Sequence, residues 1–432
     1  MSTAMIVVII SFLVLMLLGV PVVFALGIPG IIWLLMSPNM PVTILAQNMM
    51  AYLNSFTLLC LPGFLFVGRL MTTCGVTDRL FNFAVALVGK FRGGLAYANC
   101  VASMMFASMS GSAIADAGGL GLVEMSMMKQ AGYKPEMAAG VTAASSIIGP
   151  IIPPSAAMVM LGAIAEISVA KMFFGGIVPG IMLCLFMCVH VWIRAHFTEE
   201  GKQWPTTELP KKERRKAILG GIPAMFTFVL ILGSILGGIC TTTEAAVIAV
   251  WYSILLGIIY KKVTFKSLWD TAKNTVRGCG PLFIIMTAAA FFSWILTREG
   301  LSRLLQTAMT GFAASYSETA LVLMCVLVFL IVGCFMDTSA AVLLLAPIII
   351  PVVKSVGIDP IYFGVLMVLG LMVGIITPPF GICLFVVSGV AKIPVKDVTK
   401  EAIRYIPAMV AVILLVVFFP QIVTFIPNTF FD

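Results

Sequence analysis

Hydrophobic residues fall in long continuous runs along the whole chain, and short polar stretches separate each run from the next. Many runs approach about 20 residues, the length that an α-helix needs to cross the hydrocarbon core of a bilayer. The alternating segments of about ten residues that a transmembrane barrel requires are absent from the sequence. The pattern therefore predicts an all-α polytopic membrane protein.

Composition and charge agree with this prediction. Of the 432 residues, 61% are hydrophobic and only 10% are charged, whereas soluble domains carry roughly 25% charged residues. This excludes a soluble enzyme. The net charge of +8 comes from Lys and Arg residues that lie between the apolar runs rather than in one basic patch. Such an excess is typical of the cytoplasmic loops of inner-membrane proteins, so the expected partner is the lipid bilayer and not nucleic acid.

The chain contains an internal repeat. Residues 149–154 (GPIIPP) align with residues 374–379 (GIITPP) at an offset of 225 positions (374 − 149). The same offset pairs several further residues, namely Gly75 with Gly300, Pro135 with Pro360 and Lys171 with Lys396. A shared G-x-I-x-P-P pattern without gaps, at the same register as these pairs, is not expected by chance. We therefore divide the chain into two homologous halves, 1–210 and 211–432.

The basic residues indicate that the two halves are inverted in the membrane. Lys90 of the first half corresponds to Ser315, so a basic loop becomes a neutral one. The opposite change occurs at Lys171. It lies near a glutamate in the first half, whereas its counterpart Lys396 in the second half lies among further basic residues. Because basic loops stay in the cytoplasm, this exchange is what an inverted repeat requires. The connecting loop at 211–216, with five basic residues, is then cytoplasmic.

Each half also contains two helix-breaking interruptions at matching places. The double prolines lie inside apolar runs at about 138–164 and 361–391, so each run is expected to form two half-helices joined by an unwound segment. Upstream, small and polar residues interrupt the segments near 95–130 and 319–353, which we expect to form re-entrant hairpins. Inverted repeats with such breaks at a midplane site are the organisation of many secondary transporters.

A few polar residues near these breaks are candidates for ion chemistry. Asp337 lies at the second hairpin tip in an apolar setting, where it either caps a helix or binds a cation; the second reading is favoured because Ser112 occupies the symmetric position. Asp116 is also near a tip, but its counterpart is Ala341, so its role stays open between structure and function. Glu244 is expected to cap the helix that starts beside it. The sequence has no GxxxxGK[ST] phosphate loop, which leaves ion gradients as the energy source.

These motifs resemble one family, the large membrane (permease) subunit of the TRAP (tripartite ATP-independent periplasmic) transporters, over essentially the full chain. The stretches that carry the resemblance are 19–27 (GVPVVFALG), 61–65 (LPGFL), 94–99 (GLAYAN), 110–116 (SGSAIAD), 148–155 (IGPIIPPS), 336–338 (MDT) and 377–381 (TPPFG). One departure is Thr242, where the family usually has a proline shortly before the glutamate.

The resemblance implies Na+-coupled secondary active import of an organic acid, namely sialic acid, another sugar acid or a C4-dicarboxylate. It implies two partners, a small four-helix membrane subunit and a periplasmic substrate-binding protein that delivers the acid. It also implies a multi-pass protein of the bacterial inner membrane with an elevator mechanism, in which the scaffold and the transport domain are each drawn from both repeats. Two or more Na+ ions are the coupling ions, and no nucleotide is used.

The resemblance also implies particular site residues. One Na+ site would use Ser110, Ser112, Gly149, Ile152 and Pro154. The second, from the repeat, would use Phe335, Asp337, Gly374, Thr377 and Pro379, with backbone carbonyls as ligands where the side chain has no oxygen. Weaker expectations for contact with the substrate are Ser155, Thr338 and Ser339, next to the breaks and tips.

Other classes of membrane protein are less favoured. An ion channel would share the re-entrant hairpins, but paired proline breaks suggest a closed two-fold site. A Na+/carboxylate symporter that works without a binding protein is a second alternative. An intramembrane enzyme would need a nucleophile with a base or a metal cluster, and the chain has only two histidines, His190 and His196, which lie far from the breaks in sequence. We therefore expect no enzymatic activity.

Overall fold

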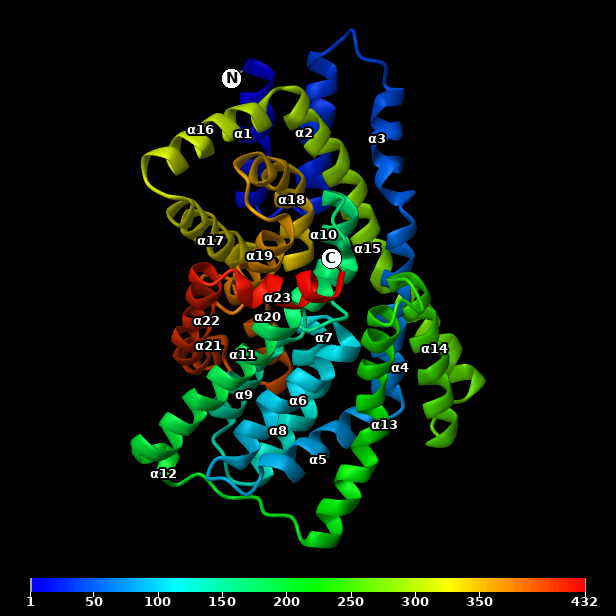
Figure 1. Cartoon of the computed structure of the whole chain (residues 1–432), viewed down its shortest axis with the longest axis vertical. Coiled ribbons are helices and arrows are strands. Elements are labelled where there is room, and N and C mark those ends of the chain that lie inside the picture. The colour runs from blue at the N-terminus through cyan, green and yellow to red at the C-terminus, as the bar shows by residue number, and fades with distance from the viewer. Residues whose placement is uncertain (1, 432) are drawn as a thin grey trace.

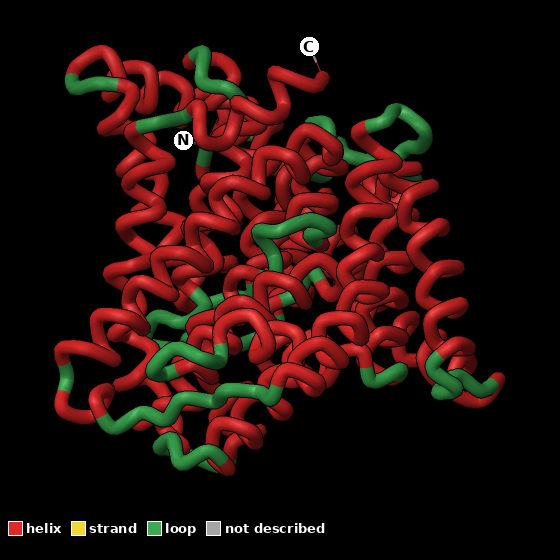
Figure 2. The backbone as a smooth tube through the Cα atoms, turned by 60° about the horizontal axis from the view of Figure 1, so that its bottom comes forward, coloured by secondary structure: helices red, strands yellow, loops and turns green. Residues whose placement is uncertain are grey.

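The computed structural model describes residues 2–431, and every regular element within them is a helix (Figures 1 and 2). Eight of these helices are long and apolar enough to cross a membrane. This confirms the prediction of an all-α polytopic membrane protein.

Glu244 has the capping role expected of it, because its carboxylate accepts a hydrogen bond from the Thr241 backbone N–H at 2.7 Å.

The helices of the first half are α1 (Thr3–Leu17), α2 (Val22–Met36), α3 (Thr43–Leu53), η1 (Phe56–Leu59), α4 (Cys60–Thr73), α5 (Val76–Val88), α6 (Gly94–Ser110), α7 (Ala113–Ala115), η2 (Asp116–Leu120), α8 (Gly121–Gln130), α9 (Pro135–Ser145), η3 (Ser146–Ile148), α10 (Ala156–Ala165), α11 (Val169–Phe197) and α12 (Glu199–Lys202). Those of the second half are α13 (Lys211–Leu236), α14 (Thr242–Ile259), α15 (Phe265–Arg298), α16 (Leu301–Ser315), α17 (Glu318–Phe335), α18 (Thr338–Val356), α19 (Pro360–Gly374), α20 (Ile382–Ala391), α21 (Val395–Ala402), η4 (Ile403–Tyr405), α22 (Ile406–Phe418) and α23 (Gln421–Phe431).

Two helical hairpins enter the molecule from opposite ends. One is formed by α6 and α8 with the short α7 and η2 between them, and the other by α17 and α18. In Figure 1 the first occupies the lower part of the molecule, the second the upper part, and their tips approach the centre. The element bounds follow the sequence offset, since α6 ends at Ser110 and α17 at Phe335. Each tip is followed by a polar N-cap residue, Ser112 in the first hairpin and Asp337 in the second.

Two interrupted helices run beside the hairpins. The first consists of α9 and α10, which are separated by η3 and the non-helical segment 149–155; the second consists of α19 and α20, which are separated by 375–381. Each begins with a proline at its first helical position, Pro135 in α9 and Pro360 in α19, where the missing N–H costs nothing. Side chains from Tyr362 to the end of α19 are buried, so this half-helix lies in the core.

Helices from the two halves interdigitate. α10 packs on α18, α9 packs on α20 and α21, and α11 packs on α19, α22 and α23. A second group surrounds α15, which contacts α2, α3 and α4, while α14 packs on α4. The hairpins and interrupted helices therefore form one packed body, with α4 and α15 lying along one side of it.

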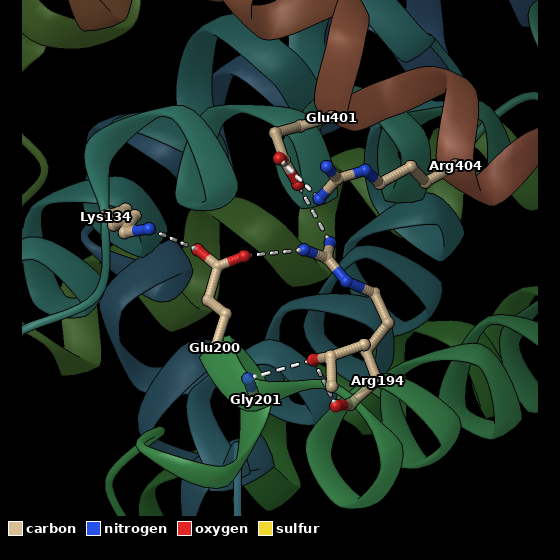
Figure 3. Close-up of polar contacts among 7 residues, drawn as sticks. Lys134, Arg194, Glu200, Gly201, Glu401 and Arg404 are labelled. Atoms are coloured by element: carbon tan, nitrogen blue, oxygen red, sulfur yellow. Dashed lines mark hydrogen bonds and ion pairs between the residues drawn. The ribbon is translucent and has the colours of Figure 1, made fainter.

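A buried ion-pair network joins the end of α11 to α21 (Figure 3). Arg194 contacts Glu401 at 2.9 Å and Glu200 at 3.3 Å, while Glu401 also accepts from Arg404 at 2.7 Å. Only 5% of Arg194 and 9% of Glu401 are exposed. Lys134 completes the network through Glu200 at 3.3 Å. Because these residues come from both halves, the network holds the halves together at this end.

Loop contacts divide the charged segments between two ends of the molecule. The turn around Lys90 pairs with the linker that precedes α13, through the Thr207 N–H and the Gly89 carbonyl at 2.9 Å. At the other end, the Lys354 ammonium donates to the Ala165 carbonyl at 3.2 Å. The sidedness of the loops and the inverted orientation of the two halves in the membrane stay predictions.

Candidate functional site

A cavity of about 360 Å³ lies where both hairpin tips approach α4 and α15. The tips contribute Ser110 and Ser112 from the first hairpin and Asp337 from the second. The opposite wall is formed by α4 and α15, with Arg69 and Gly278 among its residues. The cavity is therefore lined by elements of both halves, and residues that carry a hydroxyl, a carboxylate or a guanidinium are among those that line it.

The first tip touches the first helix break through backbone atoms. α6 ends at Ser110, and Gly111 follows in the left-handed region with φ +56°. A Cβ at Gly111 would lie 2.3 Å from the Pro154 carbonyl oxygen, so only glycine permits this approach. Gly149 also lies beside the tip, because a Cβ there would be 3.6 Å from the Ser112 carbonyl oxygen, an ordinary van der Waals distance. The first tip and the first break therefore lie side by side, and the Na+ site that the resemblance implies there stays a prediction.

The first break is closed off from solvent. Gly149, Ile152 and Pro154 are buried, and Ser110 is only 6% exposed. The Ser110 hydroxyl has no hydrogen-bond partner among the described residues. A buried hydroxyl without a partner is costly. An oxygen-coordinated cation at this place would give the hydroxyl oxygen a partner.

The second tip and the second break meet in a different way. A Cβ on Gly374 would lie 2.6 Å from the Gly333 Cα, so α17 and α19 touch backbone to backbone where their C-terminal ends meet. The Gly381 N–H then donates to the Cys334 carbonyl at 3.2 Å. The predicted site residues Phe335, Asp337, Gly374, Thr377 and Pro379 are carried by these segments. Pro379 and Phe335 are exposed on the surface of the chain, whereas Gly149, Ile152 and Pro154 of the first break are buried.

Asp337 is the N-cap of α18. Its carboxylate accepts a hydrogen bond from the Ser339 backbone N–H at 2.9 Å, so the capping role considered from the sequence is present. Capping occupies one oxygen and leaves acceptor capacity for a second interaction. The Thr377 hydroxyl donates to the Val373 carbonyl at 2.8 Å, which leaves its own oxygen able to act as a ligand. A role of either residue as a cation ligand stays a prediction.

The three expected substrate contacts differ in position. Thr338 and Ser339 line the cavity. Ser155 is fully buried, and its hydroxyl donates to the Pro150 carbonyl and accepts from the Met158 N–H at 3.3 Å. Ser155 therefore stabilises the first break and the start of α10, and it is not among the residues that line the cavity.

Two buried carboxylates lie behind the first tip. Asp116 opens the π-helical turn η2 and is 1% exposed, and neither of its side-chain oxygens has a hydrogen-bond partner among the described residues. Glu124 is fully buried in α8, where one of its oxygens accepts from the Thr142 hydroxyl at 3.4 Å. The sequence left the role of Asp116 open, and its burial does not decide between structure and function.

Sequence reasoning missed the wall of the cavity that α4 and α15 supply. Arg69 and Thr72 come from α4, and Gly278 and Leu282 from α15. One signal was available, because η1 and α4 form a candidate membrane span, Phe56–Thr73, that contains Arg69. A charged side chain inside a span is costly and marks a functional site by default.

Paired hairpins and interrupted helices surround a cavity to which both tips contribute polar residues, and the described residues include eight candidate spans. These features define a membrane transport protein of the secondary-transporter type. Residues 9–422 match the family model described as tripartite ATP-independent periplasmic transporter, DctM component. The chain therefore belongs to this family of transporter subunits, and no enzymatic family is indicated.

Curated relatives carry matching descriptions. The chain is 37% identical over 418 residues to the sialic acid TRAP transporter large permease protein SiaM of Vibrio cholerae, covering 95% of this chain and 96% of that protein. It is 34% identical over 443 residues to the C4-dicarboxylate TRAP transporter large permease protein DctM of the same organism, covering 96% and 95%. A third relative is the 2,3-diketo-L-gulonate TRAP transporter large permease protein YiaN of Escherichia coli, 33% identical over 407 residues, with 94% and 95% covered.

A solved structure shares the fold. The crystal structure of the Alcanivorax borkumensis YdaH transporter superposes with a TM-score of 0.59 and covers 86% of this chain and 88% of that chain. At 16% identity this likeness concerns the fold alone. It agrees with the helical arrangement described above.

Proposed function

We propose that this protein imports an organic acid by Na+-coupled secondary active transport. The observation that carries the proposal is the cavity that Ser110, Ser112 and Asp337 of the two tips line opposite a wall that bears Arg69. Oxygens suit an alkali cation, and a guanidinium suits an organic anion. The relatives named for sialic acid, C4-dicarboxylates and 2,3-diketo-L-gulonate support an organic acid as the substrate.

The coupling ions would bind at the two tip-and-break junctions. The first junction offers the hydroxyls of Ser110 and Ser112 with the carbonyls of Gly149, Ile152 and Pro154. The second offers Asp337 and Thr377 with the carbonyls of Phe335, Gly374 and Pro379. Unwound backbone and helix C-terminal ends are where such transporters coordinate Na+.

A cation requirement also follows from the membrane potential. Moving one negative charge into an interior-negative cell costs about 2.3 kcal/mol per 100 mV. Two Na+ ions more than cancel this cost for a monoanion and just cancel it for a dianion. A dianion would need more than two ions to be imported with net positive charge.

The arrangement of the two walls fits an elevator. The tips and broken helices would form a transport domain that moves against a scaffold including α4 and α15, with each domain drawn from both repeats. The substrate would cross the membrane with the transport domain, between the two walls of the cavity. We further propose that the protein works in the bacterial inner membrane with a small four-helix membrane subunit and a periplasmic binding protein that delivers the acid. The term "large permease protein" in the relatives' names supports a smaller partner.

Uptake into proteoliposomes tests the proposal. The chain, co-purified with its small membrane subunit, would be reconstituted and given its binding protein with radiolabelled N-acetylneuraminate, gluconate or succinate. Uptake of one of these acids should require an inward Na+ gradient and stop when Na+ is replaced by K+ or choline. Unchanged uptake in K+ or choline would reject the Na+ sites. Uptake without the binding protein would favour a stand-alone symporter, and flux that merely follows the gradient of the acid would favour a channel.

A further inference from the structure

Arg69 is a charged residue inside a candidate membrane span and lines the cavity from the α4 side. A charged side chain within a span is costly, so such a residue ordinarily has a partner or a function. No carboxylate forms an ion pair with Arg69 in the part of the chain that the structure describes. Its guanidinium charge is therefore not balanced by a protein anion.

The guanidinium is nevertheless held in place by α15. One of its terminal nitrogens donates to the Asn274 carbonyl. The other lies only 2.3 Å from where a Cβ on Gly278 would be, so the absence of a side chain at Gly278 makes room for it. A guanidinium has five N–H donors in a fixed fork. The contact to Asn274 uses one edge of this fork, which leaves donors for a ligand in the cavity.

The wall opposite Arg69 carries neutral hydroxyls and one acid. Ser112, Thr338 and Ser339 line the cavity from the tips, together with Asp337. Asp337 and Arg69 share the cavity without forming an ion pair, and Asp337 is engaged by the N-terminus of α18. The space between the two walls, about 360 Å³, suits a small organic molecule with a carboxylate at one end and hydroxyl or carbonyl groups along its length.

We propose that Arg69 binds the carboxylate of the transported acid and selects for its charge, while the tip hydroxyls contact the rest of the molecule. This rests on the function proposed above. An arginine fork matches the two oxygens of a carboxylate and gives both affinity and orientation. Because Arg69 belongs to α4 and the hydroxyls belong to the tips, the bound acid bridges the two walls in this conformation, and its contact with Arg69 breaks when the transport domain moves.

Binding to the purified membrane complex, without the binding protein, isolates this contact. Thermal stabilisation in detergent at fixed saturating Na+ would be titrated with each of N-acetylneuraminate, gluconate and succinate, and with the corresponding methyl esters (dimethyl ester for succinate). The wild type should prefer the acid over its ester by on the order of ten- to a hundredfold. Arg69→Gln should abolish this preference, and Arg69→Lys, which keeps the charge but not the fork, should retain part of it.

Two further variants separate ligand binding from a structural role. Gly278→Ala keeps the arginine but displaces its guanidinium, so the preference for the acid should fall; in the Arg69→Gln background the same change should have little further effect. Arg303→Gln, on the amphipathic helix α16 away from the cavity, removes an equal charge and should keep the wild-type preference.

The outcomes distinguish this inference from the proposed function. A wild-type preference for the acid that survives in Arg69→Gln would overturn the role of Arg69 and leave acid transport intact. An equal weakening of acid and ester binding would show that Arg69 only joins α4 to α15. If the wild type neither binds nor transports any of the three acids, the proposed function fails, and this inference fails with it.

Discussion

Asp337→Asn tests the second cation site, because the capping role and the ligand role of Asp337 respond differently to this change. Asn and Asp are equally good N-caps, so the bond from the Ser339 N–H, now 2.9 Å long, is expected to persist. What the variant loses is the charge that offsets dehydration of the ion. A charge-assisted contact contributes about 1.5–3 kcal/mol. Since about 1.4 kcal/mol corresponds to a factor of ten, half-saturating Na+ should rise roughly ten- to a hundredfold.

The assay is a Na+ titration of uptake, with the detergent melting temperature measured on the same preparation. Asp337→Asn should melt like the wild type but need far more Na+. Asp359→Asn is a matched control, because Asp359 also caps a helix, accepting from the Ile361 and Tyr362 N–H groups at 2.6 and 3.1 Å, and does not line the cavity. Ser112→Ala, which removes only a neutral ligand, should shift the titration less. A wild-type Na+ titration in Asp337→Asn, with or without a lower melting temperature, would refute the ligand role.

Two further predictions concern the architecture. In a cysteine-free version, single cysteines would be introduced at positions 90, 171, 211 and 396. An impermeant maleimide added from outside should label only position 171, because the other three positions are expected on the cytoplasmic side. Labelling of positions 171 and 396 from the same side would mean that the repeats are parallel. Glu401→Gln should lower the melting temperature strongly, because breaking a buried ion pair costs about 3–5 kcal/mol and the Arg194 side chain is only 6% exposed. Glu199→Gln, in an ion pair whose glutamate side chain is 88% exposed, should have little effect; equal melting of the two glutamine variants would contradict the role of the network.

The fold was accessible from the sequence where the bilayer imposes a strong pattern. Long apolar runs and double prolines have few structural solutions in a membrane, because every backbone polar group needs a partner there. The repeat then located the hairpins and interrupted helices, and α9 and α19 do begin at the paired residues Pro135 and Pro360. Contacts between distant segments were not accessible. No local sequence pattern predicts the ion pair between Arg194 and Glu401, because the pair depends on how α11 and α21 pack against each other.

The candidate site was predicted unevenly for a similar reason. Residues at the tips and breaks have a local signature of small and polar types in an apolar context, so Ser110, Ser112 and Asp337 could be named from sequence. The opposite wall has no such run of small and polar residues, because α4 and α15 resemble ordinary membrane spans in sequence. They meet the tips only through tertiary packing. Arg69 could have been identified from the sequence as a charged residue inside a candidate span. Gly278 could not, because its importance is that it leaves room for the Arg69 side chain, and this contact is visible only in the packed structure.

The two junctions are equivalent in sequence but not in environment, and one pair of residues accounts for much of the difference. Gly111 follows the first hairpin's long helix, and its left-handed conformation lets the tip reach the Pro154 carbonyl and bury it. The residue at the same offset is Met336, which is extended at φ −141° and carries a side chain. The second tip therefore approaches its break through Gly333 and Gly374, one turn earlier, and Pro379 stays exposed. An ion at the first junction would accordingly be enclosed by buried residues of this chain, whereas at the second junction Pro379 and Phe335 stay exposed on the surface of the chain.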